Sequence, residues 1–323
     1  MLTDRFATTD GTTTECPDYQ KEMKYCGGTW KGITNHLQYI KDLGFDAIWI
    51  SPVWKNLPNA FHGYSISDLY ALNDHFGTDQ DFKDLIKAAH DNQISVMIDV
   101  VPNHMGAVMF DYQQLNPFNK AEHFHDYCYI QNMDYQHNQW RIVNCRLLDL
   151  PDLKQEHPFV RKTLLDHVEN FVRDYSIDGL RLDAVPHMPH WFITEYYEAA
   201  KKGTVAKGQT PNDIFIVGEA FDPRFDFVRS FQQNIPGLFN FPMFFNIIDV
   251  YKRGKNPQAI SDQWKALISN LGDGVDALGL FIDNHDNQRF LFQIPEDEKW
   301  RLNNALAFIF TVRGIPCLYY GTE

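Results

Sequence analysis

Seven short apolar runs alternate along the 323-residue chain with stretches whose apolar residues recur at helical spacing. This alternation predicts an α/β fold, in which crossover helices join parallel strands. No glycine-rich dinucleotide or phosphate loop follows any predicted strand, which favours a closed (β/α)8 barrel of the TIM-barrel class over an open doubly wound sheet. Polar and acidic residues also gather where predicted strands end, the position of active sites in such barrels.

The predicted strands are short apolar runs, as expected of strands buried between helices. They cover residues 45–51, 94–101, 178–184, 214–220, 237–245, 278–283 and 315–320. Residues 2–6 (LTDRF) are interpreted as the truncated remnant of a first strand, which brings the count to eight. The predicted helices cover residues 79–92, 158–175, 191–201, 223–232, 258–270 and 299–312. The apolar face of residues 158–175 comprises Val160, Leu164, Val168, Phe171 and Val172.

One stretch, from Asn103 to Asp152, breaks this alternation, because it is rich in Asn, His, Tyr and Gln and has no clear period. A loop of this length inside a compact domain is usually functional or an inserted subdomain. We therefore expect a barrel that is interrupted by a small inserted domain after its third strand. Its parts are residues 1–103 (first part of the barrel), 104–152 (inserted domain) and 153–323 (second part of the barrel).

Composition excludes several classes of function. The chain has 29 Lys and Arg against 42 Asp and Glu, a formal net charge of −13, which argues against a nucleic-acid-binding surface. No apolar run approaches the roughly 20 residues that a membrane-spanning helix needs. Hydrophobic residues make up 44% of the chain, enough for a sizeable core. We expect a monomer that binds neither nucleic acid nor membrane.

The five cysteines have no zinc-site spacing, because no CxxC pair is present. One interpretation is two local disulfides, Cys16 with Cys26 and Cys128 with Cys145, which leaves Cys317 unpaired. Disulfides would indicate an oxidising compartment. Five reduced thiols remain the alternative, and the first residues contain no apolar signal-peptide region.

Three carboxylates, Asp183, Glu219 and Asp286, stand at or just beyond the ends of three different predicted strands. Glycoside hydrolysis needs two such groups, one as nucleophile or base and one as proton donor. A third can bind sugar hydroxyls and raise the pKa of the proton donor by like-charge repulsion. Arg181 precedes Asp183 by two residues, so both side chains share a strand face and the guanidinium should keep the carboxylate ionised.

Four motifs carry a family resemblance: DVVPNH at 99–104, GLRLDAVPH at 179–187, GEAF at 218–221 and FIDNHD at 281–286. With them the chain resembles the α-amylase family of retaining glycoside hydrolases over essentially its whole length. GGTWKG at 27–32, HGY at 62–64 and LPDL at 150–153 are most similar to fungal-type and related eukaryotic α-amylases. The resemblance implies a trimmed catalytic core that lacks the end of the barrel and a C-terminal β domain.

The resemblance also implies roles for individual residues. Asp183 would be the nucleophile, Glu219 the acid/base, and Asp286 a transition-state stabiliser that binds sugar hydroxyls. Asp99 would support Arg181 from behind. The implied substrate-binding residues are His62, Tyr64, His104, Arg181, His187 and His285.

The implied activity is endo-hydrolysis of α-1,4-glucosidic bonds in starch, glycogen and related α-glucans by a secreted or lumenal protein. A related α-glucosidase or glucanotransferase is the close enzymatic alternative. A non-catalytic family member or an inactive fragment is an alternative of a different class. A barrel aldolase or isomerase is disfavoured, because no Schiff-base lysine is evident at a predicted strand end.

A structural calcium ion (Ca2+) is the implied cofactor, since calcium prefers several oxygen ligands. The resemblance assigns it the side chains of Asn103 and Asp152 and the backbone carbonyls of Val143 and His187. A metal-free, hydrogen-bonded junction is the alternative. His123 and His125 form an HxH pair without a third ligand, and we expect both at the surface.

Position 186 departs from the family pattern, which commonly has a leaving-group-side lysine where this chain has Pro186. Proline offers neither charge nor a donor, so we expect altered binding on the leaving-group side of the cleavage point. Pro186→Lys should change the sizes of oligosaccharides released from starch, measured by chromatography of a digest. An unchanged product pattern in a folded variant would contradict this expectation.

Overall fold

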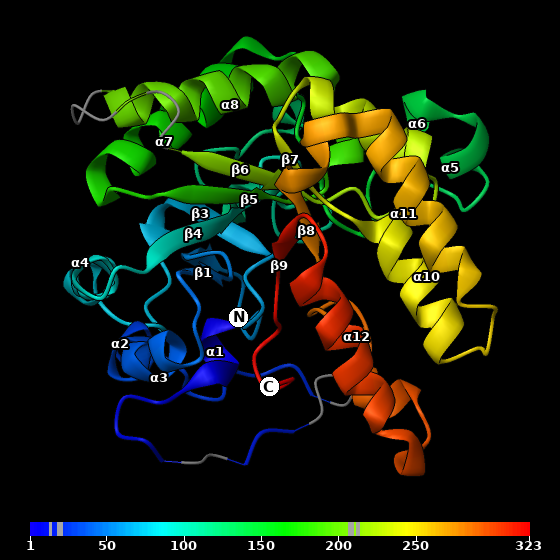
Figure 1. Ribbon diagram of the computed structural model, residues 1–323. Coiled ribbons are helices and arrows are strands. Elements are labelled where there is room, and N and C mark those ends of the chain that lie inside the picture. The colour runs from blue at the N-terminus through cyan, green and yellow to red at the C-terminus, as the bar shows by residue number, and fades with distance from the viewer. Residues whose placement is uncertain (13–14, 18–21, 206–209, 211–213) are drawn as a thin grey trace. The chain divides into compact units, whose positions relative to one another are not determined.

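The computed structural model describes residues 1–12, 15–17, 22–205, 210 and 214–323, and divides them into two compact units. The first unit comprises Met1–Phe215 and the second Ile216–Glu323. In Figure 1 the first unit runs from blue to yellow-green and the second from there to red. Each unit contains parallel strands joined by helices, which is the arrangement that the alternating sequence predicts.

The sheet of the first unit consists of β1 (Ala47–Ile50), β4 (Ser95–Val100) and β5 (Gly179–Leu182). All neighbours are parallel, and β4 lies between β1 and β5. Its apolar side chains, such as those of Ile50, Ile98 and Leu180, are fully buried. Because the strands are parallel, the residues that follow β4 and β5 emerge at the same edge.

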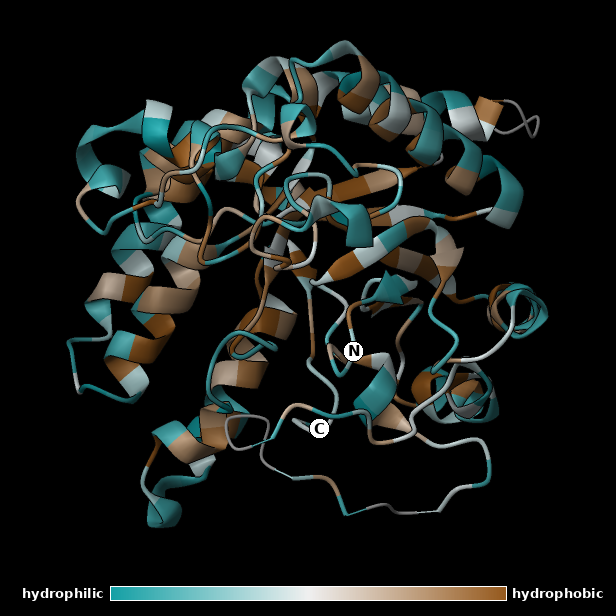
Figure 2. Ribbon diagram, turned by 180° about the vertical axis from the view of Figure 1, so that it is seen from behind, coloured by the Kyte–Doolittle hydropathy of each residue, from teal (hydrophilic) through white to brown (hydrophobic). Residues whose placement is uncertain are grey.

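Helices with one apolar face cover this sheet. α4 (Asp79–Asp91) begins at a capping box of Thr78 and Asp81, and α7 (Pro158–Tyr175) has the predicted bounds. α8 (His190–Val205) packs against α7 (Figure 1). Figure 2 shows hydrophobic and hydrophilic residues side by side on the helices, as expected of amphipathic surface helices. This unit also contains α2 (Trp30–Asn35), α3 (Leu37–Asp42) and η3 (Val185–His187).

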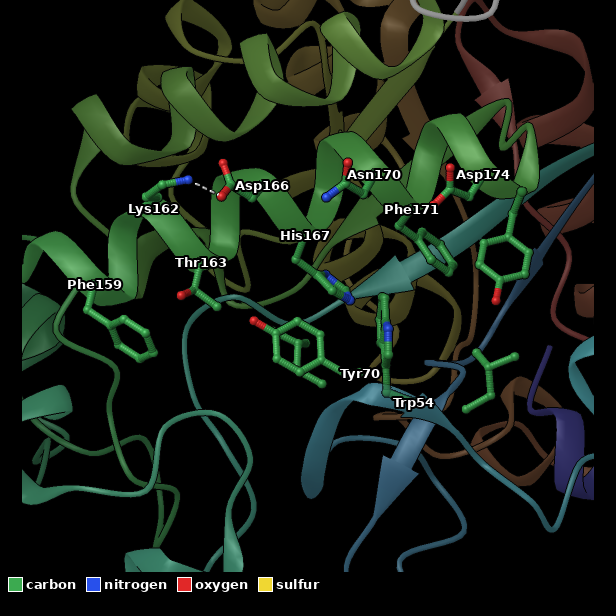
Figure 3. Close-up of a pocket in the computed structure, with 13 residues that line it drawn as sticks. Trp54, Tyr70, Phe159, Lys162, Thr163, Asp166, His167, Asn170, Phe171 and Asp174 are labelled. Atoms are coloured by element: carbon green, nitrogen blue, oxygen red, sulfur yellow. Dashed lines mark hydrogen bonds and ion pairs between the residues drawn. The ribbon is translucent and has the colours of Figure 1, made fainter.

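A hairpin that the sequence did not predict packs against α7. Its antiparallel strands are β2 (Trp54–Asn56) and β3 (Ile66–Leu72). A cavity of about 460 Å³ lies between hairpin and helix, where His167 points toward Trp54 (Figure 3). The two ring centroids are 5.2 Å apart, and burial lowers the pKa of His167 to about 4.

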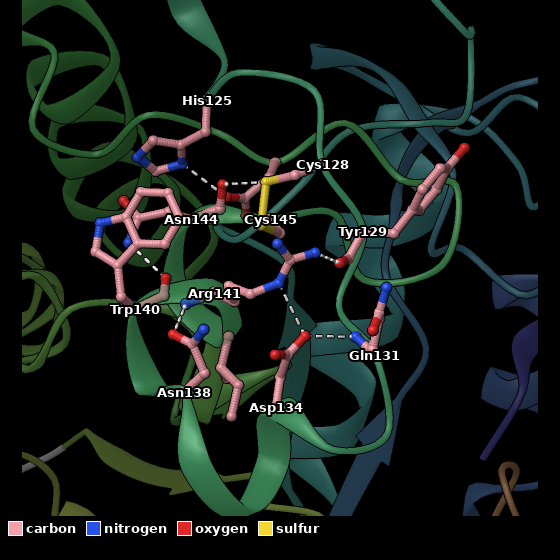
Figure 4. Close-up of a disulfide and its surroundings, with 12 residues drawn as sticks. His125, Cys128, Tyr129, Gln131, Asp134, Asn138, Trp140, Arg141, Asn144 and Cys145 are labelled. Carbon is pink, nitrogen blue, oxygen red and sulfur yellow. Dashed lines mark hydrogen bonds and ion pairs between the residues drawn. A yellow bond between two sulfur atoms is a disulfide. The ribbon is translucent and has the colours of Figure 1, made fainter.

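The stretch 104–152 lies within the first unit and contains only short helices. These are η1 (Tyr112–Gln114), η2 (Ala121–His123), α5 (Asp134–His137) and α6 (Gln139–Asn144). A disulfide joins Cys128 to Cys145, with the Cα atoms 4.9 Å apart (Figure 4). Beside it Arg141 donates from Nε to Asp134 Oδ2 at 3.0 Å and contacts the Tyr129 carbonyl.

The predicted disulfides are both present, since Cys16 is also bonded to Cys26. Cys317 carries no disulfide. The alternative of five reduced thiols is therefore not the state of this structure.

The second unit contains β6 (Phe215–Gly218, whose first residue belongs to the first unit), β7 (Gly237–Phe239), β8 (Leu278–Leu280) and β9 (Ile315–Pro316). They are parallel neighbours in that order. Phe241, Phe244 and Phe281 pack together in its core. Its helices are α9 (Phe225–Arg229), η4 (Ser230–Gln233), α10 (Phe241–Tyr251), α11 (Gln258–Leu271), η5 (Gly272–Ala277), η6 (Phe290–Gln293), η7 (Glu296–Glu298) and α12 (Trp300–Thr311).

Two strand predictions were wrong. Residues 2–6, expected as a first strand, contain the helical turn α1 (Thr3–Phe6), whose Asp4 accepts the backbone N–H groups of Cys26 and Gly27. The strand expected at 237–245 ends at Phe239. There the Asn240 side chain accepts the Met243 N–H and starts α10, an N-cap that the apolar run conceals.

Across the described parts of the chain, no helix has both the length and the apolar character that crossing a membrane requires.

We predict that His167→Phe reduces the loss of stability on mild acidification. The folded pKa of about 4 lies below the ordinary value of 6.5, so the unfolded chain takes up this proton first. The stability that depends on the neutral His167 ring is therefore complete above about pH 6.5 and is lost as pH falls toward 4. At pH 5 the free energy of unfolding is lower by on the order of 1–2 kcal/mol. Urea unfolding at pH 7, 6 and 5 measures it.

The matched control is His137→Gln, because His137 is exposed. Its stability profile should follow that of the parent protein. A parallel profile for His167→Phe would contradict the prediction.

Candidate active site

A buried guanidinium lies between two carboxylates at the carboxyl edge of the first unit's sheet. Arg181 is 1% exposed, and its Nη1 donates to Asp99 Oδ1 at 3.1 Å and to Asp183 Oδ1. Asp99 and Arg181 are register partners on β4 and β5, and Asp183 follows β5 directly. The i, i+2 spacing of Arg181 and Asp183 thus places both on one face, as expected.

Asp99 uses both carboxylate oxygens. While Oδ1 accepts from Arg181, Oδ2 accepts from Trp49 Nε1 at 3.1 Å and from the Tyr64 hydroxyl at 2.7 Å. The guanidinium carbon lies 5.3 Å from the Trp49 ring centroid and 5.8 Å from that of Tyr64. This network is charge-assisted and buried, so it holds Asp183 in a defined position with a cation beside it.

His62 and Tyr64 are positioned by each other. The Tyr64 backbone N–H donates to His62 Nδ1 at 3.0 Å, and the rings are near-parallel with centroids 5.8 Å apart. Burial, and secondly the neighbouring His104, lower the pKa of His62 to about 4. Because Nδ1 accepts the Tyr64 N–H, the neutral ring carries its proton on Nε2. His104 itself is 2% exposed.

In the second unit, Glu219 directly follows β6 and is half-buried, and Asp286 lies in the turn after β8. In that turn Asn284 Oδ1 accepts the backbone N–H of Asp286 at 3.0 Å, and His285 Nε2 lies 3.2 Å from Asp286 Oδ2. β6 and β8 are both parallel to β7, so Glu219 and Asp286 follow at the same edge.

Buried Asp283, to which the sequence analysis assigned no role, also shapes the turn after β8. It accepts the Phe290 N–H at 3.1 Å and the Thr322 hydroxyl at 3.0 Å. The available signal was the run of side-chain acceptors in DNHD, typical of turns in which Asp and Asn side chains bond nearby backbone.

The predicted site residues therefore fall into one set in each unit. The first unit holds His62, Tyr64, His104, Arg181, Asp183 and His187, and the second holds Glu219, His285 and Asp286. In the first unit, His62, Tyr64, Arg181 and Asp183 are linked through Asp99 and the ring stack. In the second, His285 and Asp286 are in direct contact.

His187 contacts the stretch 104–152. Its Nδ1 lies 3.1 Å from the Ile142 carbonyl oxygen, so η3 packs against α6, where Val143 lies. α6 ends at Asn144, and the carbonyls of a last helical turn have no intrahelical partner. Pro186 is also buried, with its carbonyl accepting from Gln139 Nε2 at 3.3 Å, so a lysine at 186 has to displace this packing.

Asn103 and Asp152 lie on paired segments and fit a cation. They are 0% and 2% exposed, and the Leu153 N–H donates to the Asn103 carbonyl at 2.9 Å. Neither Asn103 Oδ1 nor Asp152 Oδ1 has a hydrogen-bond partner among the residues that the structure describes. A buried oxygen without a partner is costly, and an oxygen-preferring cation such as calcium would satisfy both.

The same residues do not form a transition-metal site. Within the described ranges there is no group of three or more His, Cys, Asp and Glu placed for a metal ion. The candidate set consists instead of one amide oxygen, one carboxylate and the carbonyls of Val143 and His187, which is chemistry suited to calcium.

The expectation that His123 and His125 lie at the surface was wrong. His123 is 4% exposed and its ring stacks on Phe159 with centroids 4.9 Å apart. His125 Nδ1 lies 2.6 Å from Asp152 Oδ2, and Nε2 lies 3.0 Å from Glu156 Oε1. Burial raises the pKa of Asp152 to about 7, against the opposing effect of His125. Sequence alone offered only the HxH spacing.

Comparison with known proteins gives a consistent picture. Residues 1–323 match the family described as "Alpha amylase, catalytic domain". The whole chain is 35% identical to 65% of an α-amylase from Saccharomycopsis fibuligera and to 55% of α-amylase 2 from Schizosaccharomyces pombe. It therefore spans less than two thirds of the length of these curated relatives.

Solved structures show the same likeness. An α-amylase from Malbranchea cinnamomea is 35% identical, with a TM-score of 0.89 that covers 100% of this chain and 67% of the other. A cyclomaltodextrin glucanotransferase is 30% identical, with a TM-score of 0.84 that covers 100% of this chain and 71% of the other. The predicted fold class, an α/β fold of the TIM-barrel type, is confirmed.

We predict that Arg181→Met destabilises the protein by about 3–5 kcal/mol, because it leaves buried carboxylates without their counter-charge. The control is Arg161→Met, which removes an exposed pair with Glu195 on α8 and should cost at most about 1 kcal/mol. Denaturant unfolding measures both. Equal losses for the two variants would show that the Arg181 network is not the stabilising element.

Proposed function

We propose, because the chain belongs to the α-amylase family of glycoside hydrolases, that it hydrolyses internal α-1,4-glucosidic bonds of starch, glycogen and related glucans. The proposed reaction retains the anomeric configuration. The observation that carries it is the buried Arg181 held between Asp99 and Asp183 at the strand ends. This is the setting that a charged, oriented carboxylate nucleophile needs.

Asp183 is the proposed nucleophile. Its carboxylate attacks the anomeric carbon, the bond to the leaving sugar breaks, and a covalent glycosyl-enzyme forms that water then hydrolyses. Arg181 donates to the carboxylate and balances its charge, while Asp99 fixes Arg181. Asp99 is therefore a positioning residue.

Glu219 is the proposed acid/base, which protonates the leaving oxygen and then activates water. Asp286, with His285 in contact, binds hydroxyls of the distorted sugar. A retaining enzyme holds nucleophile and acid carboxyls about 5–5.5 Å apart. We expect that separation between Asp183 and Glu219.

The sugar in the cleavage subsite is proposed to lie over the Tyr64 ring, whose orientation is fixed by its bond to Asp99. His62, His104, His187 and His285 are the proposed donors and acceptors for its hydroxyls. The neutral state of His62 supports this role, because a neutral imidazole can donate from Nε2 without a charge to desolvate.

Residues 104–152 are the proposed inserted domain between the two barrel parts, 1–103 and 153–323. A calcium ion is proposed at its root, held by Asn103, Asp152 and the carbonyls of Val143 and His187. When bound, it supplies positive charge that joins the strand end to the insertion. The two unpartnered buried oxygens support it.

Two disulfides favour an oxidising compartment, so we propose that the protein is secreted or lumenal. We also propose that it acts as a monomer. A second candidate activity is transfer of glucan chains, because a glucanotransferase structure is also similar. Hydrolysis yields linear oligosaccharides with new reducing ends, whereas intramolecular transfer yields cyclic products.

We predict that digestion of soluble starch gives a ladder of linear oligosaccharides of α configuration, with viscosity falling faster than reducing ends appear. Chromatography and proton NMR of early products measure both. Asp183→Asn and Glu219→Gln should each reduce kcat by at least about 10³-fold, because each removes a group that reacts directly.

The matched control is Asp166→Asn, an exposed carboxylate of α7 paired with Lys162, which should leave kcat unchanged. Release of glucose alone from chain ends would contradict endo action. Cyclic products as the main fraction would favour the glucanotransferase.

A further inference from the structure

Asp152 and Asn103 each have one side-chain atom engaged by a histidine and one oxygen without a partner. Asp152 Oδ2 lies 2.6 Å from His125 Nδ1, and Asn103 Nδ2 lies 3.3 Å from His104 Nδ1. The remaining oxygens, Oδ1 of both residues, are buried and unpartnered within the described parts of the chain. In Asp152 the contact with His125 engages Oδ2 and leaves Oδ1 over, and in Asn103 the contact with His104 engages the amide nitrogen and leaves the one amide oxygen over.

The backbone places His125 at this position. Residues 123–125 pair with residues 152–154, since the His125 N–H donates to the Asp152 carbonyl at 3.0 Å and the Lys154 N–H to the His123 carbonyl at 2.9 Å. On its other side, Asp152 forms an antiparallel bridge with His104. Asp152 therefore lies between the end of β4 and the segment that carries His125.

The far side of the His125 ring is also held. Nε2 lies 3.0 and 3.1 Å from the two carboxylate oxygens of Glu156, and the His125 side chain is 7% exposed. Each ring nitrogen thus faces a carboxylate, so the ring has one favourable orientation. Glu156 just precedes α7, which extends the contact from the insertion to the start of that helix.

We propose that His125 is the positioning residue of the cation site: it holds Oδ2 of Asp152 so that Oδ1 is presented to the ion. The inference rests on the calcium site proposed above. A ligand carboxylate that is already oriented loses less freedom when the ion binds, and hydrogen-bonded partners of metal ligands typically contribute 10–100-fold to metal affinity. Because His125 lies in the stretch 104–152, binding of the ion also depends on that stretch being folded.

Two variants separate the contacts of the ring. His125→Ala removes both, whereas His125→Asn keeps a donor near the position of Nδ1 and loses the contact with Glu156. The control is His90→Ala, because His90 Nε2 lies 2.8 Å from Asp178 Oδ2, a similar pair remote from the insertion in sequence. Chelator-stripped protein is titrated with calcium chloride by calorimetry, and Tm is measured with calcium and with chelator.

We expect His125→Ala to weaken calcium binding about 10–100-fold, His125→Asn to weaken it less, and His90→Ala to leave it unchanged. The gap in Tm between calcium and chelator should shrink in the same order. If His125→Ala lowers Tm equally in both conditions and binds calcium normally, His125 is merely structural and the inference is overturned. A parent protein that shows no calcium binding overturns the calcium site itself and this inference with it.

Discussion

The first unit is organised around one buried positive charge. Arg181 can be removed from water only because Asp99 and Asp183 lie beside it, and Asp99 can be buried only because Arg181, Trp49 and Tyr64 donate to it. These partners come from β1, β4, β5 and the segment before β3. The parallel register of the strands is thus tied to the polar network at their ends, and a shift of one residue would break both.

Much of this was predictable from local patterns. The period of α7 and the buried runs of β4 and β5 are strong signals, because their apolar residues face one core. The hairpin β2–β3 was not predicted, because buried and exposed side chains do not alternate regularly along β3 and the pairing of the two strands contains shifts in register. The start of α10 was not predicted, because apolar residues both precede and follow Asn240 and the sequence pattern therefore does not distinguish the end of a strand from the start of a helix there.

The site was predictable to a different degree. Asp183 and Glu219 directly follow apolar runs that predict strands, so their positions at strand ends could be predicted from the sequence. The position of His125 could not be predicted in this way, because its partners are determined by backbone pairing between residues far apart in the chain. A histidine in an irregular stretch is expected at the surface until that pairing is known. The spacing of apolar residues along the chain does not show which irregular segments pair with each other over a long distance in sequence.

The pairing of His104 with Asp152 has a consequence for the stretch that lies between them. It brings the two ends of the stretch 104–152 together, so the path from β4 to α7 is closed at its base. Exposed segments between these ends that do not pair with residues 152–154 can therefore be expected to change in length while β4 and α7 keep their course. The closed base thus separates the course of the strands from the length of the exposed segments that follow them.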